Sequence, residues 1–511
     1  MVSESFNFFN EIAQSGEFFE AGEFLYSVAE IMENIDFSEA LKLYNEIIEL
    51  YKKQIIDYKL QAKLREIAEL YLRIAEIYRE KIRDFQSEKK NILNSIKFLK
   101  QESDLLKEFN ETRKIAQNFQ NIADLFLKFS DFKNAIKFYE KVINISKNHN
   151  YFDMLSYSYQ QIGSCYEEID DYNKSQDTIL DGVEFFSTLT TKFEEKNDNL
   201  TLAQIYQILK NLYKILDKQD QYINFSKKEA GAYIDLAETL EKTQENYYKI
   251  ARYYRGAGLC YQDIQNNLIE CASCFVLAGN FSKKIEDYNQ AATNFFDGAN
   301  VFKEMDNFEM AYKHFVEAGD NYWKIGSINE STESYLNAYD IAIEGELEFN
   351  RFGIFNQIIR GLNKIAEEGL KNKQFFTAAT LILESIKFYE QLDTAKDFLL
   401  REMVNNLYRY YYRAANLKKI GSSHIVLSYV LASISCILNG KLDKAWKVIS
   451  EIESEKTTVK KYKEIIKIMI ERVSEGKKVE LNNFPFDLKR IIESSEEIMF
   501  LLKLFKGFKI K

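Results

Sequence analysis

Proline and glycine are scarce in this sequence, which has one Pro and 19 Gly among 511 residues. A chain of average composition and this length would contain about 25 Pro and about 36 Gly. This shortage of turn-forming residues excludes a collagen-like chain and Pro-rich linkers, and it disfavours all-β folds. The composition therefore predicts long helices joined by short connections.

Cysteine, histidine and long apolar runs are also rare. Five Cys do not make a disulfide framework in a chain this long, which favours a reducing cytoplasm. Three His provide little imidazole for metal or acid–base chemistry, and no phosphate-binding loop or nucleophile motif occurs. No stretch approaches the ~20 apolar residues of a membrane span, and no basic segment typical of a secretory signal opens the chain. We expect a cytoplasmic, non-catalytic protein without a cofactor.

Negative charge dominates the sequence, but its distribution is uneven. The formal net charge is -10. Residues 401–511 have 22 Lys and Arg against 13 Asp and Glu, whereas residues 1–400 have 46 against 65. The most acidic segment, 301–350, has 3 basic and 11 acidic side chains. This acidic body disfavours nucleic-acid binding and leaves proteins as the expected partners.

Apolar residues recur with the helical period of 3.6 along almost the whole chain, and the pattern itself repeats. Segments 119–139 and 159–179 share the same order of aromatic, aliphatic and small residues at a step of 40 residues. Ala123 and Gly163 are small at corresponding places, as closely packed helices require. Each unit therefore predicts an antiparallel helix hairpin.

A second regularity, with a step of 20 residues, occupies the middle of the chain. Aromatic residues occur at Phe275, Phe295, Phe315 and Tyr335, and small residues follow three positions later at Ala278, Gly298, Ala318 and Ala338. Since positions i and i+3 share one helical face, we expect each ring to pack into a notch on a neighbouring helix.

The fold prediction is therefore all-α, an α-solenoid of antiparallel helix hairpins that forms a superhelix. We predict N-terminal hairpin repeats over 1–230, repeats of the 20-residue step over 231–400, and a basic helical region over 401–511. Pro485 marks the last break before a terminal helix over 487–505, which we expect to cap the solenoid.

The hairpin units resemble the tetratricopeptide repeat (TPR), without its closing Pro. The block from about 285 to 345, with Ala311-x-x-x-Phe315-x-x-Ala318-Gly319, resembles the soluble NSF attachment proteins (SNAPs), and we expect the similarity to cover residues 230–505. This resemblance implies an adaptor in intracellular protein and vesicle transport that coats a helical bundle and recruits an AAA ATPase. SNAPs grip an acidic bundle through basic residues, whereas segment 301–350 is acidic here. SNAPs also engage the ATPase through an apolar residue near the C-terminus, a place that Ile510 occupies.

Two further motifs are interpreted as parts of the helical packing rather than as chemical sites. Cys271-Ala-Ser-Cys274 has the spacing of a zinc ligand pair, but no second pair accompanies it. We therefore expect both thiols to pack in the small-residue face of a repeat helix. His314, beside the repeat aromatic Phe315, is expected to be a surface or groove residue rather than a ligand.

Two segments of the basic C-terminal region are candidate partner-binding surfaces. The run 407–413 contains Tyr408, Arg409, Tyr411 and Arg413, and Tyr and Arg are common interface anchors. Its alternative is ordinary core packing of the tyrosines. The chain end combines apolar residues with cations at Lys503, Lys506, Lys509 and next to Ile510. It fits a membrane surface or a partner groove, and its alternative is a cap on the solenoid.

The leading functional hypothesis is a non-catalytic adaptor that binds a helical bundle or an extended peptide, with an AAA ATPase as a further partner. Any membrane contact is expected to be peripheral. Two alternatives stay open at this point: a TPR scaffold of another complex, and a regulatory or sensor module.

Overall fold

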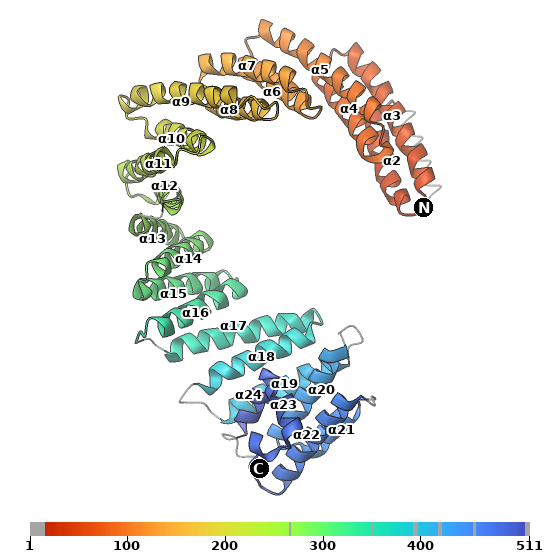
Figure 1. The fold of residues 1–511 in the computed structure, drawn as a ribbon, viewed down its shortest axis with the longest axis vertical. Helices are drawn as coiled ribbons and strands as arrows, with labels where there is room; N and C mark the ends of the chain where they lie inside the picture. The colour runs from red at the N-terminus through yellow and green to blue at the C-terminus, as the bar shows by residue number, and fades with distance from the viewer. Residues whose placement is uncertain are drawn as a thin grey trace. The chain divides into compact units, whose positions relative to one another are not determined.

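A computed structural model describes residues 16–264, 267–348, 351–391, 397–416, 422–452 and 456–505. Within these ranges the chain forms 23 α-helices, one π-helix and one 3-10 helix, and no strand (Figure 1). Consecutive helices pack against each other as antiparallel hairpins, which confirms the predicted all-α repeat fold. The chain divides into two compact units, Met1–Glu229 and Ala230–Lys511.

The first unit contains nine complete α-helices and the π-helix η1, and α11 begins in it and continues into the second unit. The elements are α2 (Phe18–Glu33), α3 (Phe37–Leu60), α4 (Leu64–Ile77), η1 (Tyr78–Ile82), α5 (Phe85–Glu108), α6 (Thr112–Leu127), α7 (Phe132–His149), α8 (Phe152–Glu167), α9 (Tyr172–Glu194), α10 (Asn199–Ile215) and α11 (Gln219–Thr239).

The second unit continues the same organisation through its described residues. Its elements are α12 (Gln244–Gln262), α13 (Leu268–Lys284), α14 (Tyr288–Glu304), α15 (Phe308–Lys324), α16 (Ile328–Glu344), α17 (Arg351–Lys371), α18 (Phe375–Glu390), α19 (Asp397–Ala415), α20 (Ser422–Leu438), α21 (Leu442–Ser450), α22 (Thr457–Ser474), η2 (Leu481–Asn483), α23 (Phe486–Glu493) and α24 (Glu496–Leu504). No helix in the described part of the chain is long and apolar enough to cross a membrane.

Short turns with a fixed chemistry separate the repeat helices. One residue with a left-handed backbone closes a helix, and an Asp or Asn that caps the next helix often follows it. Glu286 (φ 60°), Asp306 (φ 55°) and Gly326 (φ 77°) occupy this place at the predicted step of 20 residues. Asp287 then accepts a hydrogen bond from the Gln290 amide at 3.1 Å. These caps explain how the chain turns so often with so few Gly and Pro residues.

The predicted packing of rings into notches is present, one residue further along each helix than expected. A Cβ atom added to Gly279 on α13 would lie 2.8 Å from the ring of Phe295 on α14. An added Cβ on Gly319 would lie 3.0 Å from the Tyr335 ring in the same way. The absence of these side chains therefore lets an aromatic ring of each following helix approach the preceding backbone.

The terminal helix predicted over 487–505 is instead two shorter helices, α23 and α24. Ser495 breaks it because its hydroxyl accepts a hydrogen bond from the Ile498 amide at 3.3 Å and so caps a new helix. The apolar side chains of α24 still face inward, and Leu501 and Leu504 are buried in the core of the second unit. The segment therefore caps the hairpin stack as predicted, with a bend in it.

Candidate protein-interaction surfaces

A polar groove of about 620 Å³ lies in the first unit between the first helices of three successive hairpins, α6, α8 and α10. Its lining is rich in amide and hydroxyl groups. The residues are Arg113, Asn150, Phe152, Asp153, Ser156, Tyr157, Gln160, Gln204, Gln207, Ile208 and Asn211. Amide side chains both donate and accept hydrogen bonds, so this surface matches the alternating groups of a peptide main chain.

One side of the groove is held by contacts between α6 and α8. Arg113 donates to Asp153 Oδ2 at 2.8 Å, and its guanidinium lies 5.2 Å from the centre of the Tyr151 ring. On α8, Gln160 Nε2 donates to Ser156 Oγ at 3.0 Å. These contacts favour one orientation of the Asp153 and Gln160 side chains in the free protein, which lowers the entropy lost on binding.

The opposite side of the groove presents amides that are open to a ligand. Gln204, Gln207 and Asn211 lie at i, i+3 and i+7, so they share one exposed face of α10. Their side-chain amides have no hydrogen-bond partner among the described residues. This surface was not predicted from the sequence, although the spacing of the three amides on one helical face indicates it.

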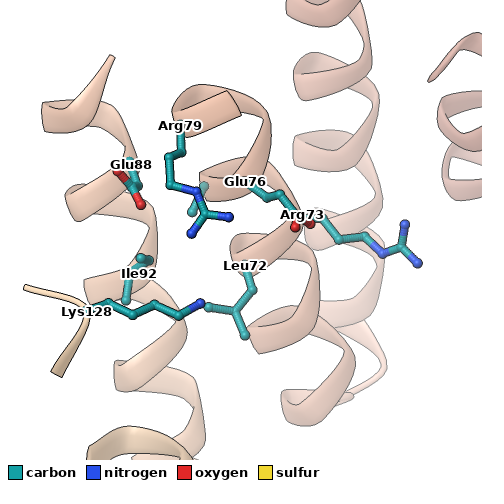
Figure 2. Close-up of a pocket in the computed structure, with 8 residues that line it drawn as sticks. Leu72, Arg73, Glu76, Arg79, Glu88, Ile92 and Lys128 are labelled. Atoms are coloured by element: carbon teal, nitrogen blue, oxygen red, sulfur yellow. The ribbon is translucent and has the colours of Figure 1, made fainter. Parts of the chain in front are cut away.

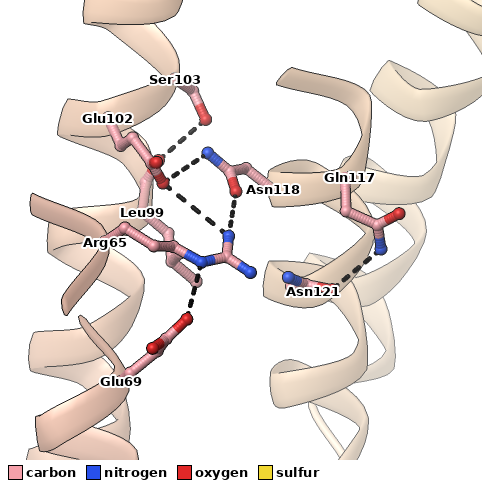
Figure 3. Close-up of polar contacts among 8 residues, drawn as sticks. All are labelled: Arg65, Glu69, Leu99, Glu102, Ser103, Gln117, Asn118 and Asn121. Carbon is pink, nitrogen blue, oxygen red and sulfur yellow. Dashed lines mark hydrogen bonds and ion pairs between the residues drawn. The ribbon is translucent and has the colours of Figure 1, made fainter. Parts of the chain in front are cut away.

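Polar contacts also join hairpins away from the groove. Figure 3 shows Arg65 reaching from α4 to Asn118 on α6, where Nη1 donates to Asn118 Oδ1 at 2.7 Å. Asn118 Nδ2 in turn donates to Glu102 Oε2 on α5 at 2.9 Å. In the second unit, Arg255 on α12 donates to Asp297 Oδ2 on α14 at 2.9 Å. Such links set the spacing of successive hairpins.

A smaller pocket of about 130 Å³ lies between α4, η1 and α5 (Figure 2). The Lys128 side chain extends past Ile92 towards Leu72, and Arg79 enters from η1. Arg79 Nη2 donates to Glu80 Oε1 at 2.7 Å. This hydrogen bond raises the pKa of Arg79, and the charges of nearby carboxylates raise it as well. Because both signs of charge are present, this pocket shows no preference for an anion or a cation.

The tyrosines of the run 407–413 mostly belong to the core of the second unit. Tyr411 is fully buried and Tyr408 nearly so, whereas Arg409 and Arg413 are exposed. Tyr408 stacks on Tyr412, and Lys444 Nζ lies 4.2 Å from the centre of the Tyr408 ring. Of the four predicted residues, only the two arginines are exposed, and their role in binding stays a prediction.

At the chain end, Lys503 is exposed on α24. Lys506, Lys509 and Ile510 lie outside the described residues, so the predicted docking of the last residues stays a prediction.

His314 is buried, so the predicted surface or groove location is wrong. Its ring stacks between Phe295 and Phe302, with centroid distances of 5.8 and 5.6 Å. Nδ1 lies 2.8 Å from Glu317 Oε2, and Nε2 has no hydrogen-bond partner among the described residues. The reason is the repeat register, because position 314 follows the 20-residue step of buried Cys274 and Asn294.

The two thiols of the Cys271–Cys274 motif are buried in the helical packing. Cys271 Sγ donates to the Gly258 carbonyl at 3.3 Å, and Ser331 Oγ makes the corresponding bond to the Gly319 carbonyl at 2.8 Å. Burial raises the pKa of Cys271 and of Cys274 to about 12. Among the residues that the structure describes, no cluster of three or more His, Cys, Asp or Glu side chains is arranged to hold a metal ion.

The stacked hairpins and the polar groove define a helical-repeat scaffold, a class that presents extended surfaces to other proteins. Residues 167–383, fewer than half of the chain, match the family model described as "Soluble NSF attachment protein, SNAP". This match confirms the resemblance seen in the sequence. It begins further towards the N-terminus than the predicted residue 230, and it ends at residue 383, so it does not include the C-terminal segment up to 505.

Other similar proteins match at low identity. The response regulator aspartate phosphatase I of Bacillus subtilis (strain 168) is 28% identical over 174 residues, which are 32% of this chain and 42% of that protein. The chain thus spans about two fifths of the length of this curated relative. The apo form of RapI is 14% identical with a TM-score of 0.21, covering 63% of this chain and 97% of its own. BtubC (BKLC) from P. vanneervenii is 14% identical with a TM-score of 0.18, and the match covers 51% of this chain and 94% of BtubC. The fold assignment itself depends on the helix hairpins of this chain.

Proposed function

We propose that this protein is a cytoplasmic, non-catalytic adaptor that binds an extended segment of a partner protein in the groove between α6, α8 and α10. The open amides of α10, Gln204, Gln207 and Asn211, carry this proposal. They face a groove whose other wall is already ordered by Arg113 and Asp153. The main chain of a bound peptide would use both the donor and the acceptor of each side-chain amide. Because these contacts involve main-chain groups, binding would depend little on the sequence of the peptide.

Within this adaptor class, we propose a SNAP-like role in intracellular protein transport, with recruitment of an AAA ATPase. The match of residues 167–383 to the SNAP family model supports it. SNAPs bind acidic helical bundles, but segment 301–350 of this chain is itself acidic. We therefore expect the partner that contacts this segment not to be acidic. The exposed Arg409, Arg413 and Lys503, with Lys506, Lys509 and Ile510, are proposed as contacts to the recruited protein. Any membrane contact would be peripheral.

A regulatory module is the second candidate function, and the similarity to a response regulator aspartate phosphatase favours it. In this case the groove would receive a response-regulator protein. Incubation of the purified chain with a phosphorylated response regulator tests the catalytic version directly, because accelerated loss of the aspartyl phosphate would contradict a non-catalytic adaptor.

The groove is tested by capturing partners from native lysate with the full chain and with two matched triple variants. The groove variant combines Gln204→Ala, Gln207→Ala and Asn211→Ala. The control combines Gln101→Ala, Asn144→Ala and Gln176→Ala, which remove exposed amides from other helices of the same unit. Quantitative mass spectrometry should show proteins that the groove variant loses and the control keeps.

Identical partner sets for the two variants would contradict the groove as the binding site. The identity of the lost proteins tests the finer proposal. An AAA ATPase together with coiled-coil membrane proteins would support the SNAP-like role, whereas unrelated complexes would reject it and leave the scaffold function.

A further inference from the structure

Four lysines form an exposed cluster on α5 and α7, on helices that contribute no residue to the groove. We call Lys97, Lys100, Lys137 and Lys141 the lysine patch. Lys97 and Lys100 lie on one face of α5, and Lys137 and Lys141 on one face of α7. The patch is unusual because residues 1–400 carry 46 basic against 65 acidic side chains.

Aromatic rings hold two of the four ammonium groups, those of Lys100 and Lys141, near each other. Lys100 Nζ lies 4.9 Å and Lys141 Nζ 4.6 Å from the centre of the same Phe138 ring. Lys141 Nζ also lies 5.1 Å from the centre of the Phe119 ring on α6. The aliphatic stems cover apolar surface in this way while the charged ends stay in solvent.

Two exposed carboxylates lie close to the patch in sequence, Asp104 on α5, which pairs with Lys107, and Glu140 on α7. No ion pair joins the four lysines to a carboxylate within the described part of the chain, although ion pairs are common elsewhere in this unit. Partial burial lowers the pKa of Lys100, and the like charges of Lys141 and Lys137 lower it further. An incoming anion would relieve this repulsion.

The patch is small and has borders that limit what can bind it. On one side, Lys59 of α3 lies against α5, with its Nζ 5.7 Å from the centre of the Phe98 ring. On the other side is α9, whose Phe185 ring lies 5.1 Å from Lys147 Nζ. There α9 exposes Asp177, Asp181 and Glu184. A membrane plane or a nucleic-acid strand would meet this negative border, whereas a short acidic segment would not.

We infer that the lysine patch is a docking site for a short, carboxylate-rich segment of a partner protein. The segment would lie across α5 and α7 and place carboxylates between Lys100, Lys137 and Lys141. Exposed Leu93 on the same face of α5 offers one apolar contact beside them. This site is independent of the proposed groove, so either can fail without the other.

Fluorescence anisotropy of a short fluorescein-labelled oligoglutamate peptide with the full chain tests this inference. The patch variant combines Lys100→Gln, Lys137→Gln and Lys141→Gln. The control combines Lys42→Gln, Lys114→Gln and Lys174→Gln, which lose the same charge from lysines that have carboxylate partners. We expect the patch variant to bind about tenfold more weakly and the control within about twofold of the original chain.

Equal losses in the two variants would overturn the inference, because the peptide would then respond only to net charge. Stronger patch-dependent binding of vesicles with anionic lipid, or of single-stranded DNA, would also overturn it in favour of another polyanion. Circular dichroism of all three proteins verifies that the exchanges leave the helices intact.

Discussion

Gly279 on α13 lies directly under the ring of Phe295 on α14, and a methyl group on Gly279 would come within 2.8 Å of that ring. Phe295 is fully buried and its ring stacks on His314 at a centroid distance of 5.8 Å, so a shift of the ring would disturb other packed groups. Helix propensity favours Ala over Gly by about 1 kcal/mol, but overpacking costs about 1–3 kcal/mol. The contact between the added methyl group and the Phe295 ring therefore decides whether Gly279→Ala raises or lowers the stability.

We expect Gly279→Ala to lower the stability of the second unit by about 1–2 kcal/mol, measured by chemical denaturation. Gly231→Ala on α11 is the matched control, because an added Cβ there meets no atom within 4 Å. It should raise stability by up to about 1 kcal/mol. A stabilising Gly279→Ala would show that the ring is not fixed in the notch.

Substitutions at two of the repeat turns should change the stability of the protein in opposite directions. Glu286 and Gly326 occupy corresponding turns with left-handed backbones, at φ 60° and 77°. Because a side chain is strained there, Glu286→Gly should stabilise the protein and Gly326→Ala should destabilise it, each by about 1 kcal/mol. Thermal unfolding followed by circular dichroism measures both, and shifts of the same sign would argue against backbone strain as the cause.

Buried tyrosines that donate to carboxylates predict sensitivity to alkali. Tyr44 donates to Glu33 Oε1 at 3.0 Å, and burial followed by this hydrogen bond raises its pKa to about 12. The same causes raise the pKa of Tyr51, Tyr139, Tyr206 and Tyr335. The folded state therefore holds these protons more tightly than the unfolded chain.

Stability from these tyrosines should be complete below pH 10, the ordinary Tyr pKa, and should be lost as the pH rises from 10 towards 12. Thermal melts across this range measure the loss. Tyr44→Phe keeps the ring and removes the proton, so its melting temperature should fall less steeply with pH. An unchanged slope would exclude Tyr44 as a contributor.

A buried ion pair near the end of the first unit predicts strong coupling. Lys210 Nζ lies 2.8 Å from Glu229 Oε2, with side-chain exposures of 11% and 3%. Lys210→Met leaves a buried carboxylate without this partner and should cost about 3–5 kcal/mol. Adding Glu229→Leu should restore most of that stability. Additive losses in the double variant would show that the pair is not coupled.

The thiols predict low chemical reactivity. All five cysteines are free and buried, and burial raises the pKa of Cys165 and Cys436 to about 11 and of Cys271 and Cys274 to about 12. Since the thiolate is the reactive form, iodoacetamide at neutral pH should label the native protein slowly and the unfolded protein fast. Rapid native labelling of Cys271, or zinc that is lost in Cys271→Ala with Cys274→Ala, would contradict a packing role.

The sequence alone determined the repeat helices of the middle of the chain and their step. Phe275, Phe295, Phe315 and Tyr335 recur every 20 positions, a regularity that indicates a stack of similar helices. Turn chemistry at Asp287 is equally local, because the cap involves residues three positions apart. Local interactions of this kind are visible in a sequence without knowledge of the neighbouring helices.

The tertiary structure decided which faces meet and which stay open. Tyr408 and Arg409 are adjacent in one aromatic run, yet the first is buried and the second exposed. His314 is enclosed by Phe295 and Phe302, which lie on another helix. The groove and the lysine patch likewise combine residues from separate hairpins. Periodicity tells which residues share a helical face, but only the packing of neighbouring helices tells whether that face is covered.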